Sequence, residues 1–230
     1  MKTIAFIPVR GGSRGIPGKN IKLFCGKPLV LWVVDSLAAS EKVDKIVIAT
    51  DSEDIKKVVR SRSISNLEIY DRDPENARDE SSTESVMLEY IQKAGLSDDD
   101  IFMLVQATSP FTQTIHFDRA LDMFSKADYS SVLSCVKSTR FFWNRSGVPL
   151  NYDYLSRPRR QEMDTLFMEN GAIYINNVKN IKLHRNRLSP DIGIFEMPEY
   201  TGIELDEEDD WLFAEYIMSH IPRNNRIYMV

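Results

Sequence analysis

Short apolar runs recur along the first 140 residues with polar or amphipathic stretches between them. "TIAFIPV" (3–9), "DKIVIAT" (44–50) and "DIFMLVQ" (100–106) are continuous apolar runs of strand length. Such runs are typical of strands that are buried on both faces of a sheet. "LEIYD" (67–71) and "SSVLSCV" (130–136) predict two further strands.

The stretches between these runs have the marks of helices. "PLVLWVVDSLAAS" (28–40) begins with proline, which favours the first helical turn. A helix over 53–61 follows Ser52, a residue type that caps helix starts. Further helices are predicted over 81–95, from about 115, and over 209–221. This alternation predicts an α/β fold with a mostly parallel sheet sandwiched by helices.

Residues 138–168 interrupt the alternation. They are rich in aromatic residues and arginine, contain "RPRRQ" (157–161), and show little regular periodicity. A segment this long without a pattern is usually functional or an interface, and its composition suits an interface. "GAIYINN" (171–177) then returns to a strand pattern. We predict a single domain over 1–230 with a protruding arm at about 138–168.

Composition narrows the class of protein. The chain of 230 residues has a formal net charge of −5, which argues against general nucleic-acid binding. No apolar run approaches the roughly 20 residues of a membrane span, and the N-terminal stretch lacks the order of a signal peptide. The two cysteines, Cys25 and Cys135, form no disulfide framework. We therefore expect a cytoplasmic protein without a nucleic-acid or membrane partner.

Charge is unevenly distributed along the chain. Residues 1–34 contain six basic side chains and no acidic one, whereas "ELDEEDD" (204–210) is acidic at every position except Leu205. This separation suggests anion-binding groups near the start of the chain and cation-binding groups near its end.

The stretch "RGGSRGIPGKN" (10–20) directly follows the first predicted strand and carries four glycines and three cations. Gly11–Gly15 fits the G-x-S-x-G pattern of a nucleophile elbow, with Ser13 as the nucleophile and His184 or His220 as the base. The cationic setting, and the lack of an earlier strand to supply an oxyanion segment, argue against a hydrolase.

The same stretch fails the phosphate-loop pattern G-x-x-x-x-G-K-[ST], because serine occupies position 13 and asparagine position 20. A different anion-binding loop fits better. Glycines let backbone N–H groups approach phosphate, and Arg10, Arg14 and Lys19 add fixed positive charge suited to a triphosphate.

"RGGSRGIPGKNIK" resembles the signature loop of the acylneuraminate cytidylyltransferases. The resemblance continues in order through "ATD" (49–51), "DESSTES" (79–85), "QATSP" (106–110) and "RPRRQ…ENGAIYIN" (157–176) to the late acidic pair. It implies a Rossmann-like sugar nucleotidyltransferase fold and a homodimer formed through the arm. It also implies transfer of CMP from CTP to the anomeric hydroxyl of a nine-carbon, sialic-acid-like keto-acid sugar, with release of pyrophosphate.

The resemblance assigns roles to individual residues. The expected CTP-binding residues are Arg10, Gly11, Gly12, Ser13, Arg14, Lys19, Asn20, Arg72, Ser82 and Thr83. Those expected at the sugar are Gln106, Thr108, Ser109, Arg157, Arg160 and Tyr174. The expected catalytic groups are Arg10, Arg14, Lys19 and Asp206. The local sequence alone also fits helix caps at Ser82 and Thr83, and a β-turn at Thr108 and Ser109.

The family binds Mg²⁺ through a D-x-D pair, which here reads Glu204-Leu205-Asp206. A spacing of two places both carboxylates on one face of an extended segment, and carboxylate oxygens suit Mg²⁺. Asp206 matches the pattern, whereas Glu204 is longer by one methylene and either binds directly or through water. Asp209 and Asp210 are better suited to capping the last helix.

Three other functions stay open at this point. They are a cytidylyltransferase for an eight-carbon keto-acid sugar, a serine hydrolase, and a catalytically silent nucleotide-binding protein. Within the favoured function, the preferred sugar also stays open, because an N-acyl group and a hydroxyl at carbon 5 both occur among nonulosonates.

Overall fold

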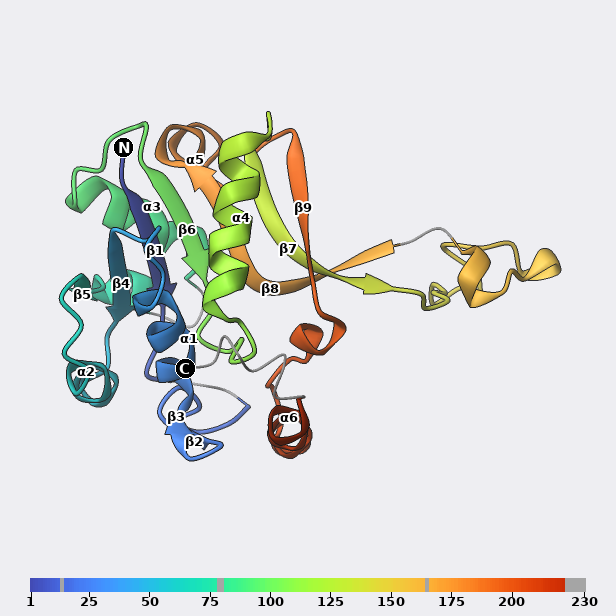
Figure 1. Ribbon diagram of the computed structural model, residues 1–230, viewed down its shortest axis with the longest axis horizontal. Coiled ribbons are helices and arrows are strands. Elements are labelled where there is room, and N and C mark those ends of the chain that lie inside the picture. Colours follow the sequence, from blue (N-terminus) through green and yellow to red (C-terminus); the bar gives the residue numbers. More distant parts are fainter. Residues whose placement is uncertain (13–14, 78–80, 164–165, 222–230) are drawn as a thin grey trace.

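The computed structural model describes residues 1–12, 15–77, 81–163 and 166–221. Within them, a seven-stranded sheet forms the centre of the molecule, in the order β5-β4-β1-β6-β8-β7-β9 (Figure 1). The strands are β1 (Thr3–Pro8), β4 (Lys45–Thr50), β5 (Leu67–Asp71), β6 (Ile101–Val105), β7 (Ser131–Ser138), β8 (Leu166–Asn177) and β9 (Ile192–Met197).

Most neighbouring strands run parallel, as predicted, and β8 is the exception. It pairs antiparallel with both β6 and β7, whereas β1 pairs parallel with β4 and β6. An apolar run alone does not reveal strand direction, so the sequence did not predict this reversal. Because β7 and β8 are antiparallel neighbours, the chain joins them without a crossover helix, and the segment between them is free to project.

Helices cover both faces of the sheet. They are α1 (Leu29–Ala38), α2 (Glu53–Arg60), α3 (Thr83–Lys93), α4 (Thr114–Lys126), α5 (Val178–His184) and α6 (Glu208–His220). Side chains of α1, α2 and α4 pack in one apolar cluster with the sheet, and those of α3 and α5 pack in another. The α2 helix starts at the predicted cap, where Ser52 Oγ accepts a hydrogen bond from Ile55 N at 3.4 Å.

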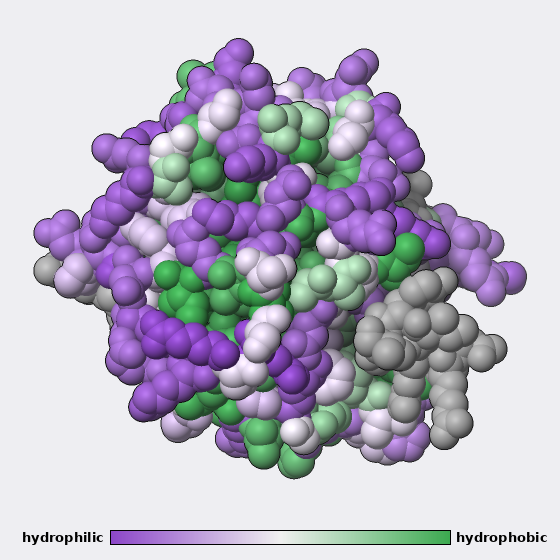
Figure 2. Space-filling view, turned by 60° about the vertical axis from the view of Figure 1, so that its left-hand side comes forward, coloured by the Kyte–Doolittle hydropathy of each residue, from purple (hydrophilic) through white to green (hydrophobic). Residues whose placement is uncertain are grey.

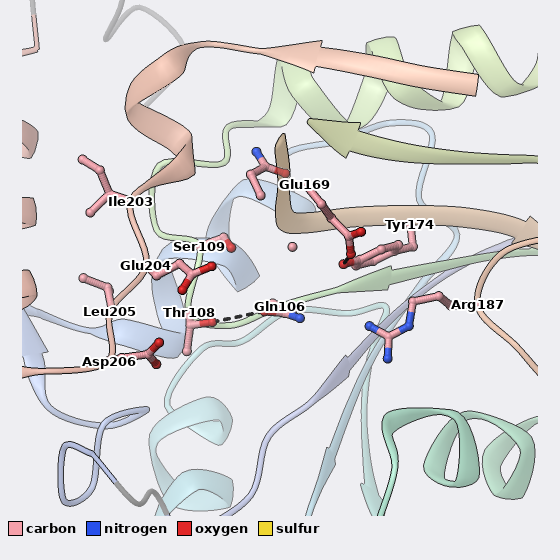
Figure 3. Close-up of a pocket in the computed structure, with 12 residues that line it drawn as sticks. Gln106, Thr108, Ser109, Glu169, Tyr174, Arg187, Ile203, Glu204, Leu205 and Asp206 are labelled. Atoms are coloured by element: carbon pink, nitrogen blue, oxygen red, sulfur yellow. Dashed lines mark hydrogen bonds between the residues drawn. The ribbon is translucent and has the colours of Figure 1, made fainter. Parts of the chain in front are cut away.

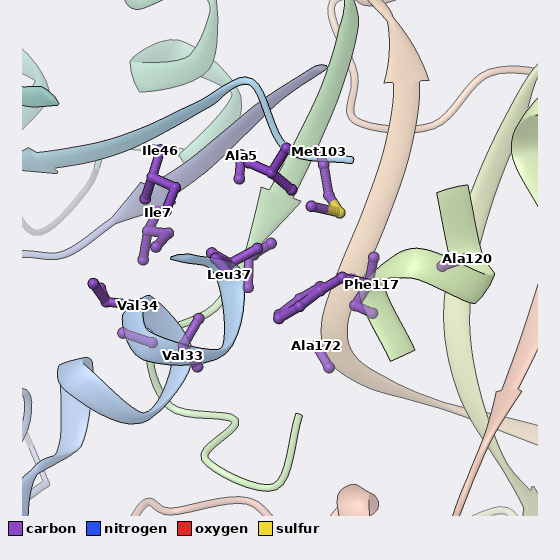
Figure 4. Packing of buried hydrophobic residues seen from close by; sticks show 14 of the residues in the cluster. Ala5, Ile7, Val33, Val34, Leu37, Ile46, Met103, Phe117, Ala120 and Ala172 are labelled. Atoms are coloured by element: carbon purple, nitrogen blue, oxygen red, sulfur yellow. The ribbon is translucent and has the colours of Figure 1, made fainter. Parts of the chain in front are cut away.

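The alternation of side chains along β1 explains this layering. Ala5 and Ile7 face the α1 and α4 side, where Figure 4 shows Leu37 and Phe117 against the strands. Ile4 and Phe6 belong to the opposite cluster with α3. All four strand residues are almost completely buried, so the continuous apolar run reflects burial on both faces.

Residues between β7 and β8 extend away from the sheet as an arm (Figure 1). The arm contains the 3₁₀ turns η2 (Tyr154–Ser156) and η3 (Arg160–Glu162) and has Leu150 and Leu155 exposed at 63% and 80%. A protruding segment is therefore observed where the sequence predicted one. Its role in dimerisation and the single-domain organisation stay predictions.

A third apolar cluster joins the two ends of the described chain. Ile16 from the opening loop and Phe24 from the small β2–β3 hairpin (Leu23–Phe24 and Lys27–Pro28) pack with Leu205 and with Trp211 of α6. The Phe24 and Trp211 rings meet edge to face, with centroids 5.5 Å apart. This cluster brings the acidic segment beside the glycine-rich loop.

The outer surface is largely polar on the face that Figure 2 shows, where hydrophilic residues surround smaller hydrophobic areas. In the part of the chain that the structure describes, no helix combines the length and apolar character needed to cross a bilayer. The remaining short elements are the 3₁₀ turns η1 (Pro74–Ala77) and η4 (Glu199–Gly202). The sequence did not predict α5 or β9, both of which are short.

Candidate active site

Two adjoining cavities open at the carboxyl ends of β1 and β6. The first, of about 210 Å³, is called the loop cavity; its lining residues are Pro8, Arg10, Gly12, Lys19, Asn20, Thr83, Gln106, Ala107 and Thr108. The second, of about 500 Å³, is called the acidic cavity; its lining residues are Gln106, Thr108, Ser109, Glu169, Asn170, Gly171, Tyr174, Arg187, Ile203, Glu204, Leu205 and Asp206. Because Gln106 and Thr108 line both, the cavities meet at the end of β6.

The glycine-rich loop is fastened to the end of β4. Gly11 N donates to Asp51 Oδ1 at 3.0 Å, and Asn20 Nδ2 donates to Arg10 O at 3.1 Å. The loop cavity thus receives Arg10, Lys19, Asn20 and the backbone at Gly12, all predicted for CTP. Gly11 instead anchors the loop through Asp51. The predicted residues Ser13 and Arg14 lie outside the described residues.

Lys19 links the loop to the acidic segment. Its Nζ donates to Leu205 O at 2.5 Å and lies 3.2 Å from Asp206 Oδ1. The Lys19 side chain is 12% exposed, whereas that of Asp206 is 69% exposed. Two residues predicted for different parts of the chemistry therefore meet at the boundary of the two cavities, which places a cation next to a carboxylate that can still reach a ligand.

Gly15 makes this contact between chain ends possible. A Cβ atom added at Gly15 would lie 2.1 Å from Asp206 O, far inside the contact distance of real Cβ atoms. The loop and the acidic segment can approach this closely only where position 15 lacks a side chain.

We therefore expect Gly15→Ala to lower the free energy of unfolding by about 1–3 kcal/mol, the usual cost of overpacking. Urea unfolding measures it. Gly12→Ala is the matched control, because a Cβ there meets nothing within 4 Å, and it should change stability by less than about 0.5 kcal/mol. Equal stability of the two variants would contradict the contact between Gly15 and Asp206.

The residues predicted to bind the cytosine base lie near the loop cavity. Thr83 lines it, whereas Ser82 caps α3 by accepting from Ser85 N at 3.1 Å. Arg72 Nε donates to Ala49 O at 3.1 Å. Burial lowers the pKa of Arg72, an effect that nearby Asp51 opposes. Arg72 is absent from the described lining of both cavities, so base contact by Ser82 and Arg72 stays a prediction.

Four of the six residues predicted at the sugar line the acidic cavity: Gln106, Thr108, Ser109 and Tyr174 (Figure 3). Gly171 has φ of +69°, and a Cβ there would lie 3.1 Å from Gln106 Oε1. The absence of a side chain at Gly171 thus lets the Gln106 amide sit against β8.

Arg157 and Arg160, the other two residues predicted at the sugar, are absent from the described lining of both cavities, and their contact with the sugar stays a prediction. Both belong to the arm, between the last residue of β7 and the first of β8, which projects from the sheet (Figure 1). The Arg157 guanidinium lies 4.1 Å from the centroid of the Phe141 ring, within the arm itself.

Among the described residues, the cationic side chain in the lining of the acidic cavity is that of Arg187, which was not predicted from the sequence. Its Nε donates to Glu84 Oε1 at 2.6 Å, and its guanidinium lies 5.0 Å from the centroid of the Tyr174 ring. Burial lowers the pKa of Arg187, but Glu84 outweighs this and raises it overall. Arg187 sits in an irregular stretch after α5, where no pattern marks it.

Glu169 and Asn170 were also missed, although they immediately precede the predicted "GAIYINN" strand. The Tyr174 hydroxyl donates to Glu169. Burial, with help from this carboxylate, raises the pKa of Tyr174. Asn170 is buried and donates to Thr201 Oγ1 at 3.0 Å, which fixes β8 against η4.

Glu204 and Asp206 both line the acidic cavity, and the buried Leu205 between them points into the third apolar cluster. Asp210 Oδ2 accepts from Asp206 N at 3.1 Å and Glu207 N at 2.8 Å, so it caps α6 as expected. Among the described residues, no group of three or more histidine, cysteine or acidic side chains could hold a metal alone. A metal at this carboxylate pair would need oxygen ligands from substrate and water.

Solved structures share this fold. One is CMP:2-keto-3-deoxy-manno-octonic acid synthetase complexed with CTP, with a TM-score of 0.67 and 18% identity over 95% of this chain and 99% of that one. Another is 4-diphosphocytidyl-2C-methyl-D-erythritol synthase from Anaerococcus prevotii, with a TM-score of 0.69 and 13% identity over 95% of this chain and 96% of that one. These likenesses confirm the predicted nucleotidyltransferase fold.

Proteins that are similar to this chain in sequence also bear the names of cytidylyltransferases. The chain is 36% identical to N-acylneuraminate cytidylyltransferase of Oncorhynchus mykiss over 92% of its own length and 49% of the relative's. It is 28% identical to the protein of that name from Streptococcus agalactiae, over 96% of this chain and 54% of the relative. The chain thus spans about half the length of the curated relatives it matches. The family model described as cytidylyltransferase matches residues 4–218. The chain therefore belongs to the cytidylyltransferase family.

Proposed function

We propose that this protein transfers CMP from CTP to the anomeric hydroxyl of a nonulosonic sugar, giving a CMP-sugar and pyrophosphate. The junction of the two cavities at Gln106 and Thr108 carries the proposal. A triphosphate in the loop cavity and a sugar in the acidic cavity would meet there, with Lys19 alongside. The names of the sequence relatives support the choice of nucleotide and sugar.

The proposed chemistry is an in-line attack of the sugar hydroxyl on the α-phosphorus of CTP. Phosphoryl transfer of this kind depends on positioning and charge neutralisation, with little covalent help from the protein. Arg10 and Lys19 would bind phosphate oxygens and stabilise the negative charge of the departing pyrophosphate. Gln106 would hold the sugar, since its amide lines both cavities.

The carboxylates of Glu204 and Asp206 fit Mg²⁺, because they are exposed, lie on one side of an extended segment and face the same cavity. When bound, Mg²⁺ would supply positive charge to the phosphate oxygens. Asp206 is the nearer of the two to the loop, through its contact with Lys19. Lys19 would then leave the carboxylate and turn to the phosphates.

We also propose that the protein works as a cytoplasmic homodimer. The arm supports the dimer, since it exposes Leu150, Tyr154 and Leu155 well away from the sheet. Neither Cys25 nor Cys135 is in a disulfide, which suits a reducing compartment. Light scattering should give twice the chain mass for the wild type, and Leu150→Glu with Leu155→Glu should give the monomer.

The function is tested by incubating the purified chain with CTP, Mg²⁺ and one of several nonulosonates, and measuring pyrophosphate. Sugar-dependent release is expected, and reactions without sugar are the control. Release only with an eight-carbon keto-acid sugar would support that alternative. CTP binding without release from any sugar would support a silent nucleotide-binding protein. Activity that survives Ser13→Ala rules out Ser13 as a nucleophile.

A further inference from the structure

The Lys19 side chain lies between two sets of acceptors. It lines the loop cavity, where the triphosphate is proposed to bind. Its Nζ also contacts Leu205 O at 2.5 Å and Asp206 Oδ1 at 3.2 Å. The same Asp206 carboxylate lines the acidic cavity with Glu204, and Figure 3 shows both side chains on one segment. The ammonium group of Lys19 is therefore next to an oxygen that a divalent cation at this carboxylate pair would need.

The backbone on both sides of this contact is held in place. Lys19 N donates to Ile16 O at 3.1 Å, and Ile16 packs with Leu205 in the third apolar cluster. Asp206 O approaches Gly15 so closely that a side chain there would collide with it. Since the loop and the acidic segment are fastened to each other, we expect Lys19 to leave Asp206 by rotation of its side chain.

A divalent cation and the Lys19 ammonium group cannot share the Asp206 oxygen without repulsion. Lys19 Nζ lies 3.2 Å from Asp206 Oδ1. Because Mg²⁺ binds carboxylate oxygens at about 2.0–2.1 Å, the two positive charges would be within about 5 Å of each other. Like charges at this distance repel appreciably near a protein surface. The Lys19 side chain is mostly buried, so water screens the repulsion incompletely.

A triphosphate in the loop cavity would remove this conflict. Its charged oxygens are acceptors for which Lys19 can exchange Leu205 O and Asp206 Oδ1. The Asp206 carboxylate would then be available to the metal, and the same phosphates would supply further oxygen ligands. Nucleotide and metal would thus favour each other's binding through the position of one side chain.

We propose that Lys19 excludes divalent cations from Asp206 until CTP is bound, so that metal and nucleotide enter the site together. This inference rests on the nucleotide and metal sites of the proposed function. An uncharged side chain at position 19 should open the metal site in the absence of nucleotide. The same change should weaken binding of the metal–CTP complex, because the phosphates lose a cation. A purely structural role of Lys19 would not give effects of opposite sign.

The test measures Mn²⁺ binding by electron paramagnetic resonance, because Mn²⁺ prefers the same octahedral oxygen ligands as Mg²⁺. Without nucleotide, Lys19→Met and Lys19→Gln should each bind Mn²⁺ about 3- to 10-fold more tightly than the wild type, the range for one partly exposed charge contact. With CTP and no sugar, the Kd of the Mn²⁺–CTP complex should be about 10-fold or more higher in both variants, since a hydrogen bond to a charged group is lost.

Lys22→Met is the matched control, because Lys22 pairs with Glu208 and is absent from the described lining of both cavities. It should leave both binding constants unchanged. In an Asp206→Asn background, Lys19→Met should no longer tighten Mn²⁺ binding, because the contested charge is gone. Lys19 variants that bind Mn²⁺ no more tightly than the wild type without nucleotide would overturn the proposal, as would a gain that survives Asp206→Asn. If these metal effects appear but no sugar gives pyrophosphate, the proposed transfer of CMP fails and this inference stands.

Discussion

Replacement of Lys19 by methionine is expected to lower kcat about 100- to 1,000-fold, the usual loss when a group that stabilises transition-state charge is removed. Lys19 lines the loop cavity together with Arg10, and its Nζ contacts Leu205 O and Asp206 Oδ1. Methionine preserves most of the length and packing of the Lys19 side chain, which is mostly buried. Pyrophosphate release under saturating CTP and sugar measures the effect.

Lys22→Met is the matched control on the same loop. Lys22 pairs with the exposed Glu208 at 2.5 Å and lines neither cavity. An exposed ion pair contributes about 0–1 kcal/mol to stability, so this variant should fold and keep turnover close to that of the wild type. Turnover by Lys19→Met close to that of Lys22→Met would remove Lys19 from the proposed chemistry.

Asp206→Asn is expected to raise the Mg²⁺ concentration that gives half-maximal rate by about 10-fold or more, since Mg²⁺ depends on charged oxygen ligands. The amide oxygen can still accept from Lys19, so the variant removes the negative charge and keeps the loop contact. A magnesium titration of pyrophosphate release measures the shift.

Two comparisons sharpen this experiment. Asp209→Asn removes a neighbouring exposed carboxylate that lines neither cavity, and it should leave the titration unchanged. Glu204→Asp moves a carboxylate by one methylene. Tolerance of that change would fit water-mediated binding by Glu204, whereas harm equal to that of Asp206→Asn would make Glu204 a direct ligand. An unaltered titration for Asp206→Asn would exclude it as a metal ligand.

Strands and segments whose sequence pattern arises from burial were predicted correctly. The apolar runs of β1, β4 and β6 are buried on both faces, so their composition identified them, and their ends correctly indicated the edge of the sheet where the cavities open. Leu205 likewise alternates with two exposed acidic residues, so the extended segment and its exposed face followed from the sequence.

Contacts that depend on tertiary packing could not be predicted from the pattern of apolar and polar residues. The direction of β8 depends on the strands beside it, with which it pairs antiparallel. That direction lets the arm project from the sheet, and Arg157 and Arg160 lie in this arm rather than in the cavity lining. Arg187 reaches the cavity because Glu84 of α3 holds it, a contact between residues 103 positions apart. Neither residue lies in a periodic pattern that would reveal the other.

The apolar cluster of Ile16, Phe24, Leu205 and Trp211 has a consequence for how the protein is made. The opening loop leaves the ribosome before its acidic partner, which lies near the other end of the described chain. N-terminal parts of a chain generally begin to fold first during synthesis. The central sheet can therefore assemble while the loop still lacks Leu205 and Asp206. The acidic cavity is completed only when residues 203–206 take their place, so a nascent chain that stops short of them would have a core but an incomplete cavity.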